Sequence, residues 1–158
     1  MNIQITIKDY GTMIAKLYEE ASPKAVQTFL EFVDLGLFND RIIQRIAPDF
    51  VLQFTYENYN DPRLEKIIPL ESSDIPFVKG TIGLGGDGTS IASPSDFFIS
   101  LKEDEGKLHQ KFTVLGQIIQ GYEIIEKIVQ VETIDHSVPG VVILQPKKDI
   151  IVEKIERL

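Results

Sequence analysis

The opening of the chain constrains the fold most, because its side chains alternate between apolar and polar as a half-buried strand requires. This alternation runs over Asn2–Lys8 and resumes over Thr12–Tyr18. Between the two runs, Asp9-Tyr10-Gly11 supplies residues typical of a tight turn. The pattern predicts that the fold begins with an antiparallel hairpin. Its apolar face is expected to comprise Ile3, Ile5, Ile7, Met13, Ala15 and Leu17.

Short runs rich in β-branched and aromatic residues recur along the rest of the chain, separated by clusters of Gly, Pro, Asp and Ser. Six such runs are expected to be strands: Arg41–Ile46, Phe50–Tyr56, Gly80–Leu84, Asp96–Leu101, Phe112–Gln117 and Ile150–Ile155. With the opening hairpin they make eight strands. Eight short strands predict a mainly β fold, a closed antiparallel β-barrel.

Two segments have the periodicity of helices. Residues 22–35 carry an apolar stripe, begin with Ser22-Pro23 and end before Gly36. We expect the Ser22 oxygen to accept from free backbone amides, Pro23 to occupy the first helical position, and Gly36 to adopt a left-handed conformation. Tyr122–Val131 has a second apolar stripe opposite charged residues. The two helices are expected to cap the barrel.

Composition narrows the function classes. A chain of 158 residues is expected to form one domain over 1–158. The net charge of −8 disfavours nucleic-acid binding, and no apolar run is long enough to span a bilayer. The absence of cysteine and the presence of only two histidines argue against disulfides and a metal site. No signal-peptide pattern is recognisable, so we expect a cytoplasmic protein. We also expect it to need no metal or other cofactor.

Two local motifs suggest other chemistry but lack its context. Gly83–Gly88 has the glycine spacing of a dinucleotide-binding loop, yet no helical stripe follows it. We interpret its glycines as places of close backbone approach. Asp135-His136-Ser137 places the residue types of a catalytic triad side by side, where triads normally draw on separate parts of a fold. We interpret it as a polar loop.

The segment Phe38–Gln53 resembles the signature of the cyclophilins, a family of peptidyl-prolyl cis/trans isomerases. Three later segments resemble further family strands in the right order: Gly80-Thr81-Ile82-Gly83-Leu84, Ser95-Asp96-Phe97-Phe98-Ile99 and Phe112–Gln117. The resemblance covers essentially the whole chain and is to divergent, bacterial-like, single-domain forms. It implies a cyclophilin-like barrel that binds proline-containing peptides and folding proteins, as a monomer and with no cofactor.

The resemblance also assigns the site. Arg45 corresponds to the catalytic arginine, which would donate a hydrogen bond to the prolyl nitrogen as the amide twists. Gln53, the second catalytic residue, would orient Arg45 or bind the substrate backbone. The substrate-binding residues it implies are Phe50, Val51, Phe98, Leu108 and Phe112 around the proline ring, with Gly85 and Gly86 offering backbone groups to an extended peptide.

Several positions depart from the family pattern. Gln44 replaces a histidine, Gly85-Gly86 an Ala-Asn pair and Asp96 a glutamine, and the chain has no tryptophan. Weak cyclosporin binding is the implied prediction. Two alternatives to an isomerase remain from the residues alone. One is a non-catalytic module that binds proline peptides or partner proteins, and the other is a related barrel that binds a small metabolite in a deep pocket.

Overall fold

The computed structural model describes residues 1–54 and 61–158. Its elements, in chain order, are β1 (Asn2–Ile7), β2 (Gly11–Leu17), α1 (Pro23–Asp34), β3 (Arg41–Ile42), β4 (Arg45–Ala47), β5 (Val51–Phe54), the short 3₁₀ helix η1 (Pro62–Glu65), β6 (Ile68–Pro69), β7 (Thr81–Gly85), β8 (Ile91–Ser100), β9 (Val114–Gln120), α2 (Tyr122–Ile128), β10 (Thr133–Asp135), β11 (Leu144–Pro146) and β12 (Ile151–Arg157). The strand predicted over Phe50–Tyr56 appears as β5, and its last two positions lie outside the described residues.

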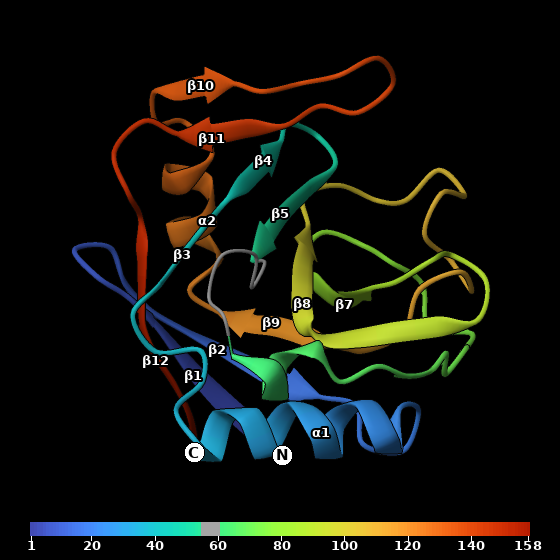
Figure 1. The fold of residues 1–158 in the computed structure, drawn as a ribbon. Coiled ribbons are helices and arrows are strands. Elements are labelled where there is room, and N and C mark those ends of the chain that lie inside the picture. Colours follow the sequence, from blue (N-terminus) through green and yellow to red (C-terminus); the bar gives the residue numbers. More distant parts are fainter. Residues whose placement is uncertain (55–60) are drawn as a thin grey trace.

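The strands form one curled antiparallel sheet (Figure 1). Its central order is β4-β5-β8-β7-β9-β2-β1-β12-β3. Because β3 and β4 are two halves of one segment, separated only by Ile43-Gln44, this order returns to its starting point. The described residues thus form twelve strands where eight were predicted, and nine of them make this circuit of the barrel. The short strands β6, β10 and β11 are added to it, β6 pairing with β8 and β11 with β4.

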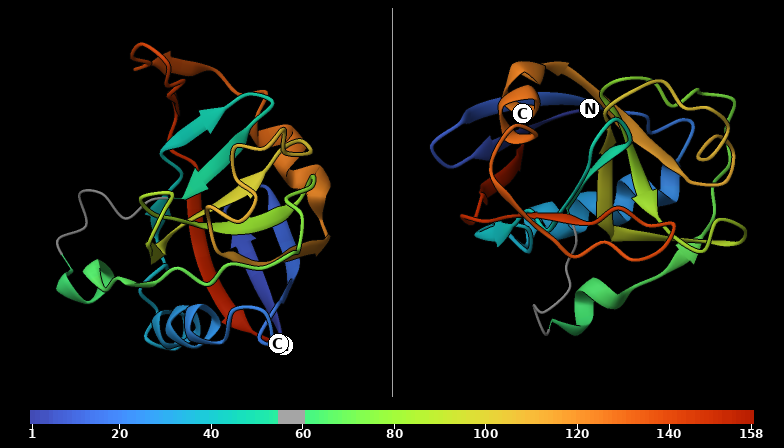
Figure 2. Two further views of the ribbon diagram at one scale, coloured as in Figure 1. Left: turned by 90° about the vertical axis from the view of Figure 1, so that its right-hand side faces the viewer. Right: turned by 90° about the horizontal axis from the view of Figure 1, so that it is seen from above.

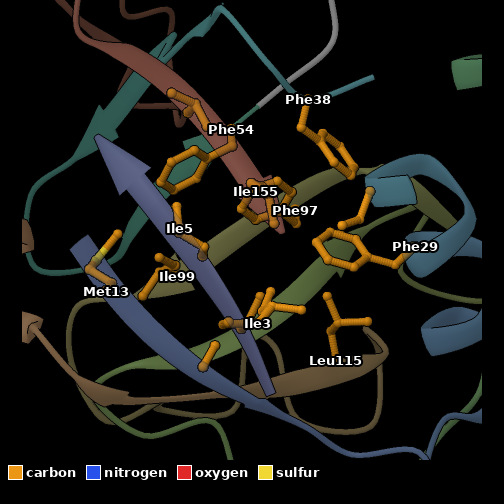
Figure 3. Packing of buried hydrophobic residues seen from close by; sticks show 14 of the residues in the cluster. Ile3, Ile5, Met13, Phe29, Phe38, Phe54, Phe97, Ile99, Leu115 and Ile155 are labelled. Carbon is orange, nitrogen blue, oxygen red and sulfur yellow. The ribbon is translucent and has the colours of Figure 1, made fainter. Parts of the chain in front are cut away.

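The core of the barrel is built by the alternating faces that the sequence predicted. Ile3 and Ile5 are fully buried on β1, and Met13 lies on the same side of the neighbouring β2 (Figure 3). The ring of Phe97 on β8 stacks on Phe54 at 4.6 Å between centroids. It also meets the edges of Phe29 and Phe38, at 5.6 and 5.5 Å. These rings join helix α1 to the barrel, and α1 covers its lower end in Figure 1.

The N-terminus of α1 is not capped as the sequence suggested. Ser22 is fully buried, and its hydroxyl donates to the carbonyl of Val114 at 2.7 Å instead of accepting from the helix. The free amides of Lys24 and Ala25 donate to the carboxylate of Glu71, at 3.2 and 2.7 Å. Glu71 lies 46 residues further along the chain from Ala25, so local sequence could not reveal this cap.

The other helix boundaries follow the prediction more closely. Gly36 follows α1 with φ +70°, the left-handed conformation expected of it. Helix α2 ends at Ile128, before the predicted Val131, because the amides of Gln130 and Val131 bond to carbonyls only three residues back and tighten the last turn. None of the helices among the described residues is both long and apolar enough to cross a membrane.

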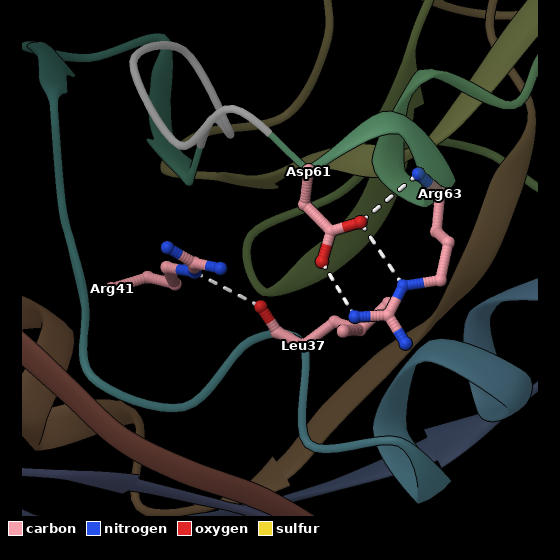
Figure 4. A network of polar contacts seen from close by, with 4 residues as sticks. All are labelled: Leu37, Arg41, Asp61 and Arg63. Atoms are coloured by element: carbon pink, nitrogen blue, oxygen red, sulfur yellow. Dashed lines mark hydrogen bonds and ion pairs between the residues drawn. The ribbon is translucent and has the colours of Figure 1, made fainter.

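A polar network secures the surface beside η1 (Figure 4). The Asp61 carboxylate accepts from the backbone amide of Arg63 and from its guanidinium Nε and Nη2, at 3.0, 3.0 and 2.7 Å. These hydrogen bonds lower the pKa of Asp61 to about 2. Nearby, Arg41 Nε donates to the carbonyl of Leu37 at 3.0 Å. The contacts hold the segment before β3 and the start of η1.

Candidate active site

The strand register brings three predicted site residues into one row. On β4, Arg45 lies opposite Gln53 of β5, and Gln53 lies opposite Phe98 of β8. In an antiparallel sheet, residues directly opposite each other project on the same face. The guanidinium, the amide and the phenyl ring therefore lie side by side across three strands, although 53 residues separate the first from the last in sequence.

A chain of hydrogen bonds orients the Arg45 side chain. Its Nη1 donates to Gln53 Oε1 at 3.0 Å, and Gln53 Nε2 donates in turn to Asp96 Oδ1 at 2.9 Å. Since the carboxylate can only accept, it fixes which end of the Gln53 amide faces the arginine. Arg45 Nε donates to the backbone carbonyl of Val142 at 2.8 Å. The guanidinium is thus held from two sides.

The charge of Arg45 is maintained at the site. Partial burial lowers the pKa of its guanidinium, and the negative charge of Asp96 opposes that shift. A guanidinium stays protonated at physiological pH even when its pKa falls moderately. Arg45 therefore presents a fixed cation that can donate hydrogen bonds but accept none.

Beside this polar row lies a second hydrophobic cluster, separate from the barrel core. We call it the pocket cluster; its buried members are Ala47, Val51, Phe77, Phe98, Leu108 and Val114. Phe50 and Phe112 are half-buried and pack against it. The Phe98 ring stacks on Phe77 at 5.8 Å and meets the edge of Phe112 at 6.1 Å. The cluster offers the apolar surface that a proline ring requires.

A tightly bonded loop holds Leu108 in this cluster. The Asp104 carboxylate accepts from the backbone amides of Lys107, Leu108 and His109 at 2.9–3.0 Å. Burial tends to raise the pKa of Asp104, but these amides outweigh it and the pKa is lowered. The Lys107 ammonium lies 5.5 Å from the centre of the Phe50 ring, within range of a cation–π contact.

A hollow of about 490 Å³ adjoins both the polar row and the pocket cluster. Arg45, Phe50 and Leu108 all line it. Val51 and Phe98 belong to the cluster beside it, and Phe112 packs against that cluster. Seven of the nine predicted residues, Gln53 included, are thereby brought together.

Gly85 and Gly86 are placed differently from the other predicted residues. A side chain at Gly85 would come within 2.5 Å of the Asp96 carboxylate, and one at Gly86 within 2.3 Å of the Ile91 carbonyl. The close backbone approach expected of these glycines is thus to their own chain. Gly86 is exposed, and its role toward a substrate stays a prediction.

Three contributors to the site lay beyond the sequence-based assignment. Asp96 appeared there only as a departure from the family pattern, and Phe77 and Val142 did not appear. The dipeptide Pro139-Gly140 between valines is a turn signal that could have revealed the hairpin carrying Val142. No comparable sequence signal points to Phe77, since it lies in the short loop segment Ile75-Pro76-Phe77-Val78, whose apolar residues show no sustained period.

The two alternative motifs are resolved by their contacts. The glycine-rich segment Gly83–Gly88 leads into strand β8 and not into a helix. The helix N-terminus that a dinucleotide site requires is therefore missing after this segment. In the other motif, Asp135 accepts from the amide of Ser137, and Ser137 Oγ accepts from the amide of Ile143, at 2.8 and 2.9 Å. Both side chains serve the backbone of a loop, as interpreted.

A fixed arginine beside an aromatic pocket on a closed antiparallel barrel defines a protein of the cyclophilin type. The comparisons agree. The family model for cyclophilin-type peptidyl-prolyl cis-trans isomerases matches residues 2–156, so the chain belongs to that family. The family and the activity class predicted from the sequence are thereby confirmed, and the chain is an isomerase by its family.

Individual relatives are distant. Peptidyl-prolyl cis-trans isomerase A of Dickeya dadantii is 25% identical over 130 residues, which cover 78% of this chain and 68% of that one. Isomerase B of Escherichia coli is 22% identical over 157 residues, 93% of this chain and 94% of that one. A cyclophilin of Cryptosporidium parvum, crystallised in the presence of the dipeptide Ala-Pro, superposes with a TM-score of 0.86 at 19% identity and covers 100% of this chain and 99% of that one. The last comparison confirms the fold.

Proposed function

We propose that this chain accelerates cis/trans rotation of X-Pro bonds in peptides and folding proteins with Arg45 as its catalytic residue, by stabilising the twisted amide without a covalent intermediate. The observation that supports this proposal most is the fixed Arg45 guanidinium, hydrogen-bonded to Gln53 and Val142 beside the pocket cluster.

The chemistry requires little more than these groups. Rotation about the X-Pro bond breaks amide conjugation over a barrier of about 18–20 kcal/mol, and no other bond is made or broken. In the twisted state the prolyl nitrogen becomes pyramidal and its lone pair can accept a hydrogen bond, which the planar nitrogen accepts poorly. A donor placed for the twisted state binds it more tightly than either planar form and so lowers the barrier.

Each remaining residue has a role in this proposal. Phe50, Val51, Phe98, Leu108 and Phe112 hold the proline ring while the preceding carbonyl swings. Gln53 positions Arg45, and Asp96 positions Gln53. The exposed Gly86 offers backbone groups to an extended substrate, and the buried Gly85 supports that segment. No step calls for a metal or another cofactor.

The proposal extends to the state of the protein. We propose that residues 1–158 form one cyclophilin-like domain that acts as a monomer in the cytoplasm, on proline-containing peptides and unfolded proteins and not on nucleic acid or membranes. The cysteine-free composition is compatible with a reducing compartment, and the charge of −8 disfavours phosphate-rich partners. Sedimentation and cell fractionation test these statements directly.

The decisive experiment measures cis-to-trans exchange of an Ala-Pro-Phe peptide by NMR. It compares the wild type with Arg45→Ala and with Arg45→Lys, which keeps the charge but loses the planar guanidinium. We expect Arg45→Ala to lower kcat/KM by about 10²–10³-fold, the usual effect of removing one preorganised transition-state donor. If the folded wild type accelerates exchange in none of several peptides that differ in the residue before proline, the chain is instead a non-catalytic binding module.

A further inference from the structure

The motif Asp135-His136-Ser137 lies on the hairpin that supplies the second anchor of Arg45. This hairpin, residues 133–146, consists of β10, β11 and their connection, and it stands at the top of the molecule in Figure 1 and in the left view of Figure 2. The proposed mechanism uses one of its atoms, the Val142 carbonyl oxygen, which accepts from Arg45 Nε at 2.8 Å. The motif contacts the opposite end of the same peptide group, so hydrogen bonds join it to the site.

One peptide group connects the motif to the arginine. Its carbonyl belongs to Val142, and its N–H belongs to Ile143 and donates to Ser137 Oγ at 2.9 Å. In a trans peptide the carbonyl and the N–H point in opposite directions from one plane. A partner that holds the N–H therefore also constrains the direction of the carbonyl. The Ser137 side chain thus helps to set how the Val142 carbonyl meets Arg45.

The series of hydrogen bonds ends at a carboxylate. Asp135 accepts from the Ser137 hydroxyl and from its backbone amide, the latter at 2.8 Å, and both bonds lower the pKa of Asp135. Because the hydroxyl gives its one proton to Asp135, its oxygen keeps lone pairs for the Ile143 N–H. All the donors thus point the same way, from the Arg45 cation to the Asp135 anion. Hydrogen bonds in such a series polarise one another, and each bond becomes stronger.

The Gln53 carboxamide shows the same arrangement on the other side of the arginine. It accepts from Arg45 Nη1 at 3.0 Å and donates to Asp96 Oδ1 at 2.9 Å. The guanidinium therefore lies between two amide groups, and each amide directs its own N–H toward an aspartate. Asp96 is half-buried, whereas Ser137 and Asp135 are exposed. Water competes with the hydrogen bonds of the exposed pair, so its effect should be the smaller of the two.

We propose that Ser137, supported by Asp135, is a positioning residue that orients the Arg45 guanidinium through the peptide group between Val142 and Ile143. This inference rests on the proposed function, since Arg45 is the catalytic residue of the same site. Neither Ser137 nor Asp135 is among the residues that line the hollow. Their loss should therefore act on the transition state, which Arg45 stabilises, and leave substrate binding nearly unchanged.

The test removes the hydroxyl and then restores it. Ser137→Ala deletes the acceptor for the Ile143 amide, and Ser137→Thr supplies another hydroxyl. Asp135→Asn keeps an acceptor for Ser137 but removes the charge. The matched control is Val138→Ala on the same hairpin, because the backbone of Val138 pairs with Val141 while its side chain is 55% exposed.

Two measurements are made on each variant after thermal unfolding has shown it to be folded. NMR exchange of the Ala-Pro-Phe peptide gives kcat and KM. The proton and nitrogen chemical shifts of the Arg45 Nε–H group report its hydrogen bond to the Val142 carbonyl, and they require no activity.

We expect Ser137→Ala to move the Arg45 shifts and to lower kcat about fivefold, the usual effect of losing one neutral hydrogen bond, with KM within about twofold of the wild type. Ser137→Thr should restore both the shifts and kcat. Asp135→Asn should lose about twofold in kcat, since it keeps the bond but not the charge. Val138→Ala should change kcat by less than about twofold, because it leaves the series intact.

Three outcomes in an active wild type overturn the proposal. The first is an unchanged kcat in Ser137→Ala. The others are an equal loss in Val138→Ala and a loss that Ser137→Thr does not restore, since both indicate a general loosening of the hairpin. If the wild type catalyses no exchange, the proposed function fails and the Arg45 shifts decide alone. Their movement in Ser137→Ala and return in Ser137→Thr then support the positioning role, and unmoved shifts overturn it.

Discussion

Asp96 allows the sharpest test of how the arginine is positioned. Its carboxylate accepts from Gln53 Nε2 at 2.9 Å, and its negative charge also acts on the Arg45 guanidinium. Replacing it by alanine leaves the Gln53 amide free to rotate away from Arg45. Replacing it by asparagine keeps an acceptor for Gln53 but removes the charge.

The size of the effect follows from these contacts. A hydrogen bond to a charged group contributes about 1.5–3 kcal/mol, and the half-buried position of the pair favours the lower end. About 1.5 kcal/mol corresponds to a loss of about twelvefold for Asp96→Ala. Asp96→Asn should lose only about two- to threefold. Both losses should fall on kcat more than on KM, because a misoriented Arg45 affects the transition state most.

The assay is NMR exchange of the Ala-Pro-Phe peptide over a range of concentrations, with thermal unfolding of each variant measured alongside. Asp34→Asn is the control, since it removes the same charge from an exposed ion pair with Arg157. Activity of Asp96→Ala within twofold of the wild type would refute the positioning role. So would an Asp96→Asn variant that is no more active than Asp96→Ala.

Three further predictions follow from named contacts. Gly83→Ala should reduce kcat/KM several-fold in the exchange assay, because the new methyl would lie 2.5 Å from the Phe98 ring and 2.6 Å from the Phe77 ring and displace this part of the pocket cluster. Unchanged activity would contradict this packing. Glu71→Ala should lower the free energy of unfolding by about 1 kcal/mol in urea, as expected for a lost helix cap, and a stability equal to that of the wild type would refute the cap. Asp61 should titrate near pH 2 by NMR, below its ordinary pKa of 3.8. Any stability that its carboxylate contributes is therefore present above pH 4 and lost as the pH falls toward 2. The titration midpoint should rise in Arg63→Ala, and an unchanged midpoint would exclude the pairing of Asp61 with Arg63.

The sequence by itself predicted the elements whose pattern is local. The hairpin β1–β2 was visible in the alternation of Ile3, Ile5 and Ile7, because a strand with one buried face must repeat every two residues. Helix α1 was visible in its stripe and in Gly36. The resemblance to a family supplied Arg45 and the pocket residues, and the structure brings most of them together.

Tertiary structure decided the contacts that join distant segments. The cap of α1 comes from Glu71, the orientation of Gln53 from Asp96, and the second anchor of Arg45 from Val142. Sheet register or a loop holds each of these three partners in place. Neither kind of placement produces a periodic pattern in the sequence. Sequence patterns report which face of an element is buried, whereas catalysis depends on which polar atoms of different elements meet, and only the folded barrel brings those atoms within hydrogen-bond distance.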